Sequence, residues 1–259
     1  MTHSTNEPKV IVTDNGAVRT VTLNRPDVRN AVDPETAKML RAAFTEFEAD
    51  ETLHVAILTG NGGHFCAGFD LTRVNDGTRD YNPDDEGPMG PTRMQLSKPV
   101  IAAVEGYAVA GGLELALWCD LRVVSQTAQF GVFCRRWGVP LIDGGTVRLP
   151  RIIGHGRAMD MILTGRAVDA QEALQIGLAN RVAAEGGALV EANQLALEIA
   201  KFPSICMRSD RLSACTQWGL SQGEALAVEA KMGANALKHD APTGAARFAR
   251  GAGRGGKFE

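Results

Sequence analysis

The sequence predicts an α/β fold that is followed by a helical C-terminal region. Short β-branched runs alternate with helix-like segments as far as residue 125, and from residue 157 onward the pattern is mostly helical. Strands that alternate with helices are typical of a sheet whose strands are connected by helical crossovers. The chain has 259 residues, of which 44% are hydrophobic and 22% charged, and this is the composition of an ordinary globular protein.

Local signals predict the elements in chain order. The expected strands and helices cover residues 10–13, 17–23, 34–49, 55–59, 99–104, 113–119, 121–125, 189–201 and 224–238. The Asn15-Gly16 pair between the first two runs is a strong hairpin signal. Asp33 before Pro34 predicts a helix N-cap with proline at the first helical position. The Gly-, Pro- and Asp-rich residues 72–91 predict a surface loop.

We expect two parts, a core at residues 1–195 and a C-terminal helical region at residues 196–259. The tail at residues 247–257 is basic and rich in glycine. This composition favours a solvated terminus over a role in ligand binding. If the tail does bind ligand, Arg247 and Arg250 are the candidates for phosphate contacts.

Charge and composition argue against several classes of partner. A net charge of -3 gives no reason to expect nucleic acid or an anionic membrane. The five cysteines contain no C-x-x-C pair and the histidines lack ligand spacing, so we expect no metal site and a reducing, cytoplasmic environment. The N-terminus is polar and resembles no secretory signal. Residues 100–119 are mostly apolar, but Glu105, Glu114 and three glycines favour a strand, a turn and a buried helix over a membrane span.

Two glycine turns stand out as candidates for chemistry, at residues 64–71 and 106–112. Glycine allows backbone to approach a ligand closely, and the N–H groups at a helix start are free donors. Two such turns that converge on one carbonyl would form an oxyanion hole, although Gly-Gly before a helix often serves packing alone. Two carboxylates accompany them. Glu114 is either a satisfied helix-start residue or an acid-base group, and Asp143 is either an N-cap or a group that faces a cavity.

At this point the residues resemble a known family. The ordered motifs are NRP at 24–26, NA at 30–31, FCAGFD at 65–70, KPVIAAV at 98–104, GYAVAGG at 106–112, ELA at 114–116, CD at 119–120, AQFG at 128–131, GGT at 144–146, LTG at 163–165, AQEA at 170–173 and GL at 177–178. Over residues 10–185 they are similar to the crotonase (enoyl-CoA hydratase/isomerase) superfamily. The resemblance implies an α/β, crotonase-like ββα spiral with a helical C-terminal trimerisation region. It further implies a homotrimer or dimer of trimers, and an acyl-CoA substrate without a separate cofactor.

The resemblance also assigns roles to individual residues. It implies that the amides of Phe69 and Gly111 hold the thioester oxygen as an enolate forms, and that Glu114 activates water. The family's hydratases carry a second glutamate where this chain has Cys134, which is here either a pocket liner or a reactive thiol. Asp143 is the candidate replacement, because relatives that resemble dienoyl-CoA isomerases use an aspartate there. Further expected pocket residues are Ala67, Asp70, Tyr81, Met89 and Met94, and the expected CoA-binding residues are Arg25 and Arg29.

The predicted function is therefore that of an enoyl-CoA hydratase-like lyase. The alternative is an enoyl-CoA or dienoyl-CoA isomerase, in which the carboxylates move a proton without adding water. An acyl-CoA hydrolase or decarboxylase is a further alternative, because one fold supports several chemistries. A non-catalytic acyl-CoA binder is disfavoured by the retention of both glycine turns and Glu114.

Overall fold

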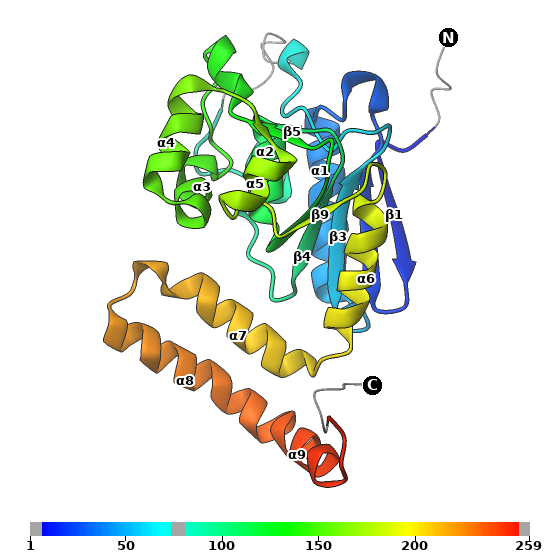
Figure 1. Ribbon diagram of the computed structural model, residues 1–259, viewed down its shortest axis with the longest axis vertical. Coiled ribbons are helices and arrows are strands. Elements are labelled where there is room, and N and C mark those ends of the chain that lie inside the picture. Colours follow the sequence, from blue (N-terminus) through cyan, green and yellow to red (C-terminus); the bar gives the residue numbers. More distant parts are fainter. Residues whose placement is uncertain (1–6, 74–80, 254–259) are drawn as a thin grey trace.

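The structure is a computed structural model, and it describes residues 7–73 and 81–253 of the chain. Its larger sheet has six strands in the order β1-β2-β3-β4-β6-β9 (Figure 1). These strands are β1 (Val10–Asn15), β2 (Val18–Leu23), β3 (Val55–Gly60), β4 (Val100–Val104), β6 (Leu121–Ser125) and β9 (Arg181–Ala183). β1 and β2 are antiparallel, and the other neighbours are parallel. The five predicted strands are confirmed to within two residues at each end.

The first hairpin and the first helix follow their local signals. Asn15, the last residue of β1, pairs with Val18, the first residue of β2, so the chain turns where the Asn-Gly pair predicts it. α1 (Pro34–Ala49) begins at the predicted proline. The Asp33 side chain accepts a hydrogen bond from the Thr36 N–H at 2.8 Å, which confirms the predicted N-cap.

Both faces of the large sheet are covered. Successive residues of a strand point to opposite faces, and β3 shows this clearly. Val55 and Ile57 pack with buried residues of α6 (Ala188–Ala200) in one apolar cluster. Ala56 and Leu58 belong to the other cluster, together with Phe44 of α1. The two helices therefore lie on opposite sides of the sheet (Figure 1), and the carboxyl ends of its parallel strands lead into the glycine turns.

A second, three-stranded sheet lies beside the first, in the order β5-β7-β8. Its strands are β5 (Tyr107–Val109), β7 (Gln129–Gly131) and β8 (Val168–Asp169). The predicted turn at residues 106–112 is thus wrong in part, because β5 occupies its middle. The strand forms there because Tyr107–Val109 finds a parallel partner in β7, a contact between segments far apart in sequence.

The remaining helical segments complete the described part of the chain. They are η1 (Pro26–Val28), η2 (Leu71–Arg73), η3 (Pro91–Arg93), α2 (Gly111–Trp118), η4 (Phe133–Trp137), α3 (Gly145–Ile153), α4 (His155–Thr164), α5 (Ala170–Gln175), α7 (Ser204–Thr216), η5 (Gln217–Gly219), α8 (Gln222–His239) and α9 (Ala241–Ala249). The predicted helices 113–119, 189–201 and 224–238 correspond to α2, α6 and α8. No helix among the described residues is both long and apolar enough to cross a bilayer.

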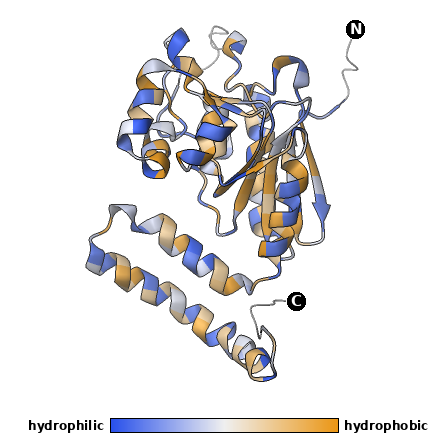
Figure 2. Cartoon of the chain, in the orientation of Figure 1, coloured by the Kyte–Doolittle hydropathy of each residue, from blue (hydrophilic) through white to orange (hydrophobic). Residues whose placement is uncertain are grey.

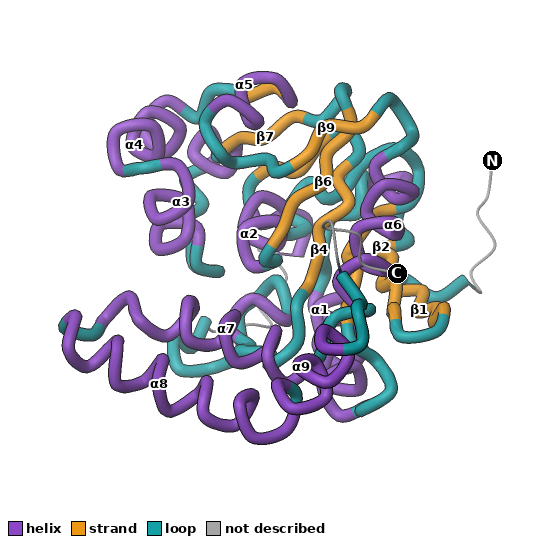
Figure 3. The backbone as a smooth tube through the Cα atoms, turned by 60° about the horizontal axis from the view of Figure 1, so that its bottom comes forward, coloured by secondary structure: helices purple, strands orange, loops and turns teal. Residues whose placement is uncertain are grey.

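The C-terminal helices extend away from the sheets. α7 and α8 run side by side as a hairpin (Figures 1 and 3). No residue of α7 is buried in the single chain. The hairpin is held to the core by ion pairs, of which Arg211 with Asp120 at 2.9 Å is the shortest. The predicted boundary at residue 195 falls inside α6, and the division into two parts stays a prediction.

The segment predicted as a surface loop, residues 72–91, is only partly one. Residues 74–80 lie outside the described residues. Residues 81–86 are exposed, but Gly87, Met89, Gly90 and Pro91 are buried. The prediction of a surface loop is therefore wrong for residues 87–91, because their backbone packs into the core beside Asp143.

Candidate active site

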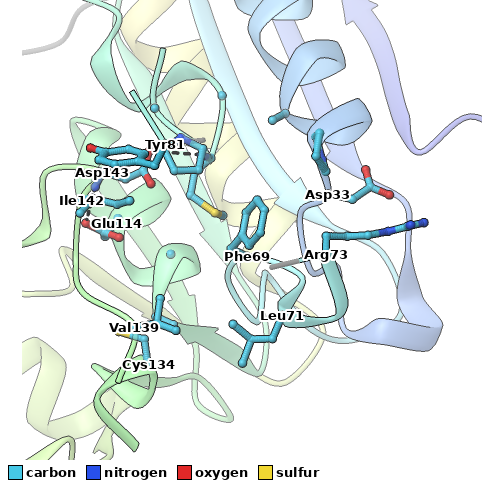
Figure 4. Close-up of a pocket in the computed structure, with 18 of the residues that line it drawn as sticks. Asp33, Phe69, Leu71, Arg73, Tyr81, Glu114, Cys134, Val139, Ile142 and Asp143 are labelled. Carbon is cyan, nitrogen blue, oxygen red and sulfur yellow. Dashed lines mark hydrogen bonds between the residues drawn. The ribbon is translucent and has the colours of Figure 1, made fainter. Parts of the chain in front are cut away.

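A cavity of about 780 Å³ opens between the start of α1, the glycine turns, the segment 81–90 and the loop after η4. Figure 4 shows Glu114 and Asp143 next to each other on one side of this pocket, with Phe69 facing them. Its apolar wall also contains Leu71 and Val139. A deep pocket with an apolar wall and a few convergent polar groups is typical of a small-molecule site.

The two glycine turns meet at this pocket. Cys66 and Ala108 form a parallel bridge, which fixes the first turn beside β5. Gly68 has a φ of +100°, and a Cβ on it would lie 2.9 Å from the Gly111 nitrogen. Glycine is therefore required at position 68, both for the backbone angle and for the close approach to the second turn.

The amides of Phe69 and Gly111 are both available to a ligand. Val32 N–H donates to the Gly68 carbonyl at 2.8 Å, and Asp70 N–H donates to the Val32 carbonyl at 2.9 Å. The Phe69 N–H, between them, points to the other side of its strand. Gly111 is the first residue of α2, so its N–H has no acceptor within the helix. Neither amide donates a hydrogen bond to any of the described residues.

Ala110 holds the second turn in an unusual conformation. It has a φ of +54° and a ψ of -125°, a region that a residue with a Cβ rarely adopts. Ala110 N–H donates to the Gly131 carbonyl at 2.9 Å, so the surrounding sheet holds this conformation in place. Backbone strain of this kind persists where the structure over-determines it, and it clusters at functional sites. Here it sets the direction of the next peptide, which carries the Gly111 N–H.

Glu114 is almost completely buried, with 2% of its surface exposed. Its Oε1 accepts hydrogen bonds from the N–H groups of Asp143 at 2.9 Å and Gly145 at 2.8 Å, at the start of α3. Burial, together with the charge of Asp143, raises the pKa of Glu114 to about 7, although the two amides oppose this shift. At neutral pH the carboxyl group is therefore divided between its protonated and ionised forms, as an acid-base group requires.

Asp143 is also buried, with 3% of its surface exposed. The residue is not the N-cap of α3, because Gly144 takes that place. Its Oδ1 accepts hydrogen bonds from Met89 N–H at 3.2 Å and from the hydroxyl group of Thr92. Burial raises the pKa of Asp143, and these hydrogen bonds and the nearby Arg148 oppose the shift. Glu114 Oε2 and Asp143 Oδ2 accept no hydrogen bond from the described residues, and both side chains line the pocket.

Comparison with known proteins identifies the family. The sequence model of the family described as "Enoyl-CoA hydratase/isomerase" matches residues 13–250 of this chain. The chain is a member of the enoyl-CoA hydratase/isomerase family. It is 35% identical to enoyl-CoA hydratase EchA19 of Mycobacterium tuberculosis, over 93% of this chain and 94% of that protein. It is also 39% identical to a carnitinyl-CoA dehydratase of Salmonella typhi, over 73% of each.

Solved structures confirm the predicted crotonase fold. The enoyl-CoA hydratase EchA1 of Mycobacterium marinum superposes with a TM-score of 0.89 at 36% identity, covering 94% of this chain and 96% of that one. An enoyl-CoA hydratase of Bacillus anthracis superposes with a TM-score of 0.86 at 29% identity, over 94% and 96% of the two chains.

Cys134 departs from the pattern of the family's hydratases. The side chain lines the pocket and is 7% exposed. Burial raises the pKa of its thiol, and the nearby Glu114 raises it further. The thiol is therefore neutral at physiological pH, and its surroundings favour a pocket liner over a reactive nucleophile. Val139, on the same wall, continues the apolar surface beside it.

The other predicted pocket residues divide into two groups. Ala67, Tyr81 and Met89 line the pocket. Met94 is outside its lining, because this side chain packs against the core. Asp70 is also outside the lining, and its carboxylate forms an ion pair with Arg25 at 3.1 Å.

The predicted CoA-binding arginines do not line the pocket. Arg25 lies between the carboxylates of Asp70 and Asp33, the latter at 3.3 Å. Arg29 lies over the ring of Tyr107 at 5.2 Å. The expected nucleotide contacts of these arginines, and those of Arg247 and Arg250, stay predictions. The cations that line the pocket are instead Lys9, Lys38 and Arg73, none of which belongs to a motif.

Sequence reasoning also missed Thr92 and Arg148, which hold Asp143 from two sides. Thr92 donates its hydroxyl hydrogen to Asp143 Oδ1. Arg148 donates to the Asp143 carbonyl at 2.9 Å and to the Thr92 carbonyl at 2.6 Å. The sequence shows that Arg148 lies two positions after the Gly-Gly-Thr motif, but this spacing does not indicate which residues Arg148 contacts.

Proposed function

We propose that this protein is an enoyl-CoA hydratase that adds water across the double bond of a 2-enoyl-CoA thioester. The observation that supports this most is that two free backbone amides and two buried carboxylates share one pocket. In the proposed complex, the thioester oxygen accepts hydrogen bonds from Phe69 N–H and Gly111 N–H. These amides stabilise the enolate more than the substrate, because the enolate oxygen carries the larger negative charge.

The acidity of the two carboxylates suggests their roles. Burial raises the pKa of both groups, that of Glu114 to about 7, so Glu114 can carry a proton at neutral pH. We therefore assign Glu114 the role of acid and Asp143 the role of base. Asp143 Oδ2 takes a proton from water while the water oxygen bonds to Cβ and the double-bond electrons move to the thioester oxygen. Protonated Glu114 then gives its proton to Cα, and the carbonyl forms again. Asp143 afterwards loses its proton and Glu114 gains one by exchange with solvent, which restores the starting forms. This order reverses the role that the resemblance implied for Glu114.

The proposal includes the form of the active protein. Coenzyme A enters as part of the substrate, with no separate cofactor. We expect a homotrimer or a dimer of trimers formed through α7, α8 and α9, in the cytoplasm. The support is that this region exposes large apolar side chains, namely Trp218 of η5, Leu226 and Leu237 of α8, and Phe248 of α9. Figure 2 shows hydrophobic positions along the same helices. Sedimentation of the purified protein measures the assembly directly.

Turnover of crotonyl-CoA and of longer 2-enoyl-CoAs tests the proposal. The assay follows the loss of absorbance of the conjugated thioester in the parent, Glu114→Gln and Asp143→Asn. Both substitutions should lower kcat by at least about 100-fold, as expected for acid-base groups. Glu46→Gln is the matched control, since its side chain is 72% exposed and lies outside the pocket. A parent that binds these thioesters but leaves the absorbance unchanged contradicts the hydratase function.

An isomerase is the second candidate, and Cys134 is the observation that favours it. Without a glutamate at this position the pocket has fewer groups to bind a water molecule, yet two carboxylates suffice to move a proton between carbons. Conversion of 3-enoyl-CoA or dienoyl-CoA, with no hydration of 2-enoyl-CoA, supports the isomerase. Release of free CoA thiol from either substrate instead indicates a hydrolase.

A further inference from the structure

The segment from Gly87 to Arg93 encloses the carboxylate of Asp143, although it lies 50 to 56 positions earlier in the chain. A Cβ on Gly87 would lie 2.3 Å from Asp143 Oδ1 and 2.6 Å from the hydroxyl oxygen of Thr92. Only glycine therefore fits here, and the Gly87 backbone closes one side of the carboxylate. Met89 N–H and the Thr92 hydroxyl group donate to the same oxygen, Oδ1. Asp143 Oδ2 is the oxygen left for chemistry.

Two arginines connect the same two segments. Arg148 donates to the carbonyl oxygens of Asp143 and Thr92, at 2.9 and 2.6 Å. Arg93 follows Thr92 in the chain, and it donates to the carbonyl of Ile142, the residue before Asp143, at 3.3 Å. The backbone is thus cross-linked on both sides of the Thr92–Asp143 hydrogen bond. Guanidinium groups suit this task because their donors have a fixed planar geometry.

We propose that Thr92 is a positioning residue that orients the carboxylate of Asp143, with Arg148 holding the backbone of both residues. This inference rests on the proposed function, in which Asp143 accepts a proton from water. The Thr92 hydroxyl group occupies Oδ1 and fixes the rotation of the carboxylate, so that Oδ2 faces the substrate. Thr92 itself is 1% exposed and does not line the pocket, so it acts through Asp143 and touches no substrate.

Thr92→Val removes the hydroxyl group and keeps the branched shape of the side chain. We expect kcat for 2-enoyl-CoA hydration to fall by about 10- to 100-fold, the scale of a small misplacement of a reacting group. KM should stay within about threefold of the parent, since no substrate contact is lost. The acid limb of the kcat profile should move to higher pH, because the Thr92 hydrogen bond lowers the pKa of Asp143. Thr92→Ser, which restores the hydroxyl group, should recover both the rate and the profile.

Thr59→Val is the matched control. Thr59 is 5% exposed, outside the pocket lining, and its hydroxyl group donates to the Ala103 carbonyl at 3.0 Å. This variant loses one buried hydrogen bond but should keep the parent's kcat and pH profile. Equal effects of the Thr59 and Thr92 variants would assign Thr92 a purely structural role and overturn the inference.

Asp143→Asn, assayed in the same series, separates this inference from the proposed function. Loss of turnover in Asp143→Asn, with Thr92→Val like the parent in kcat and acid limb, overturns the role of Thr92 alone. An Asp143→Asn variant as active as the parent overturns the proposed role of Asp143. Arg148→Lys should lower kcat in the same direction as Thr92→Val, because a lysine cannot hold both carbonyls with fixed geometry. Full activity in Arg148→Lys contradicts the part assigned to Arg148.

Discussion

Replacement of Glu114 by glutamine should abolish turnover and at the same time stabilise the fold at alkaline pH. Glutamine has the shape of glutamate, and its Oε1 can accept the same hydrogen bonds from Asp143 and Gly145. What the substitution removes is a carboxylate that is 2% exposed and whose pKa burial raises from 4.5 to about 7. A buried group of this kind lowers stability whenever it is ionised.

The size and sign of the effect follow from proton linkage. Between pH 4.5 and about 7, Glu114 binds more protons in the folded than in the unfolded chain. The free energy of unfolding therefore falls as pH rises through this window, by about 3 kcal/mol in total, and it falls no further above it. Glutamine does not titrate, so Glu114→Gln should gain about that amount over the parent at pH 8 and nothing near pH 4.5.

Thermal unfolding of the parent and Glu114→Gln at pH 5, 6, 7 and 8 measures this difference. At about 2–4 °C per kcal/mol for a domain of about this size, the variant should have a Tm roughly 6–12 °C higher at pH 8 and a nearly equal Tm at pH 5. Glu46→Gln, with its exposed side chain, should show no pH-dependent difference from the parent. A Tm difference for Glu114→Gln that is the same at all four pH values refutes the reasoning.

Three further predictions concern the amides, the thiol and the first helix. Gly68→Ala should lower kcat by about 100- to 1,000-fold, the cost of one lost oxyanion donor, because its Cβ would lie 2.9 Å from the Gly111 nitrogen. Gly16→Ala is the control: Gly16 has a φ of +58° but open space around it, so this variant should keep the parent's kcat in the same assay. Cys134→Ser should leave the alkaline limb of the pH profile near pH 7, because Glu114 and not the thiol titrates there; a limb that moves contradicts this. Burial alone would raise the pKa of Asp33, but hydrogen bonds from its partners lower it to about 2. Asp33→Asn should therefore lower the free energy of unfolding at pH 7 by about 2 kcal/mol, measured by urea titration. This loss should become progressively smaller as the pH falls from 4 to 2.

Local signals carried most of the fold that could be predicted from sequence. The Asn-Gly pair and the Asp33-Pro34 cap each specify a turn or a helix start through neighbouring residues, and both predictions are confirmed. α7 lies within the predicted helical region at residues 196–259, but its own bounds were not predicted. Its N-cap, Pro203, makes no side-chain hydrogen bond, so no capping signal marks where the helix starts.

Some residues of the candidate site could likewise be predicted from sequence, and others could not. Phe69 and Gly111 lie in the glycine turns and Glu114 follows the second turn by two residues, so their association could be predicted from motifs. The partners of Asp143 could not be, because Thr92 lies 51 residues away and only the folded chain brings the two together. The surroundings of Arg25 could not be predicted either. Its place in the NRP motif predicts a contact with CoA, which stays a prediction; in the structure it lies between the carboxylates of Asp70 and Asp33, at 3.1 and 3.3 Å.

The thiol of Cys134 lies near the buried carboxylates of Glu114 and Asp143, so its lack of charge affects their ionisation. Glu114 and Asp143 already share a buried site, where the charge of Asp143 raises the pKa of Glu114. Glu114 in turn raises the pKa of the Cys134 thiol, so the two side chains are close enough to interact electrostatically. A glutamate at position 134 would therefore place a third carboxylate beside Glu114 and Asp143. Like charges in a buried site disfavour one another's ionisation, and the proposed reaction needs one carboxylate ionised and one protonated at neutral pH. A neutral thiol at position 134 keeps the pair in that balance, because it occupies the position without adding charge.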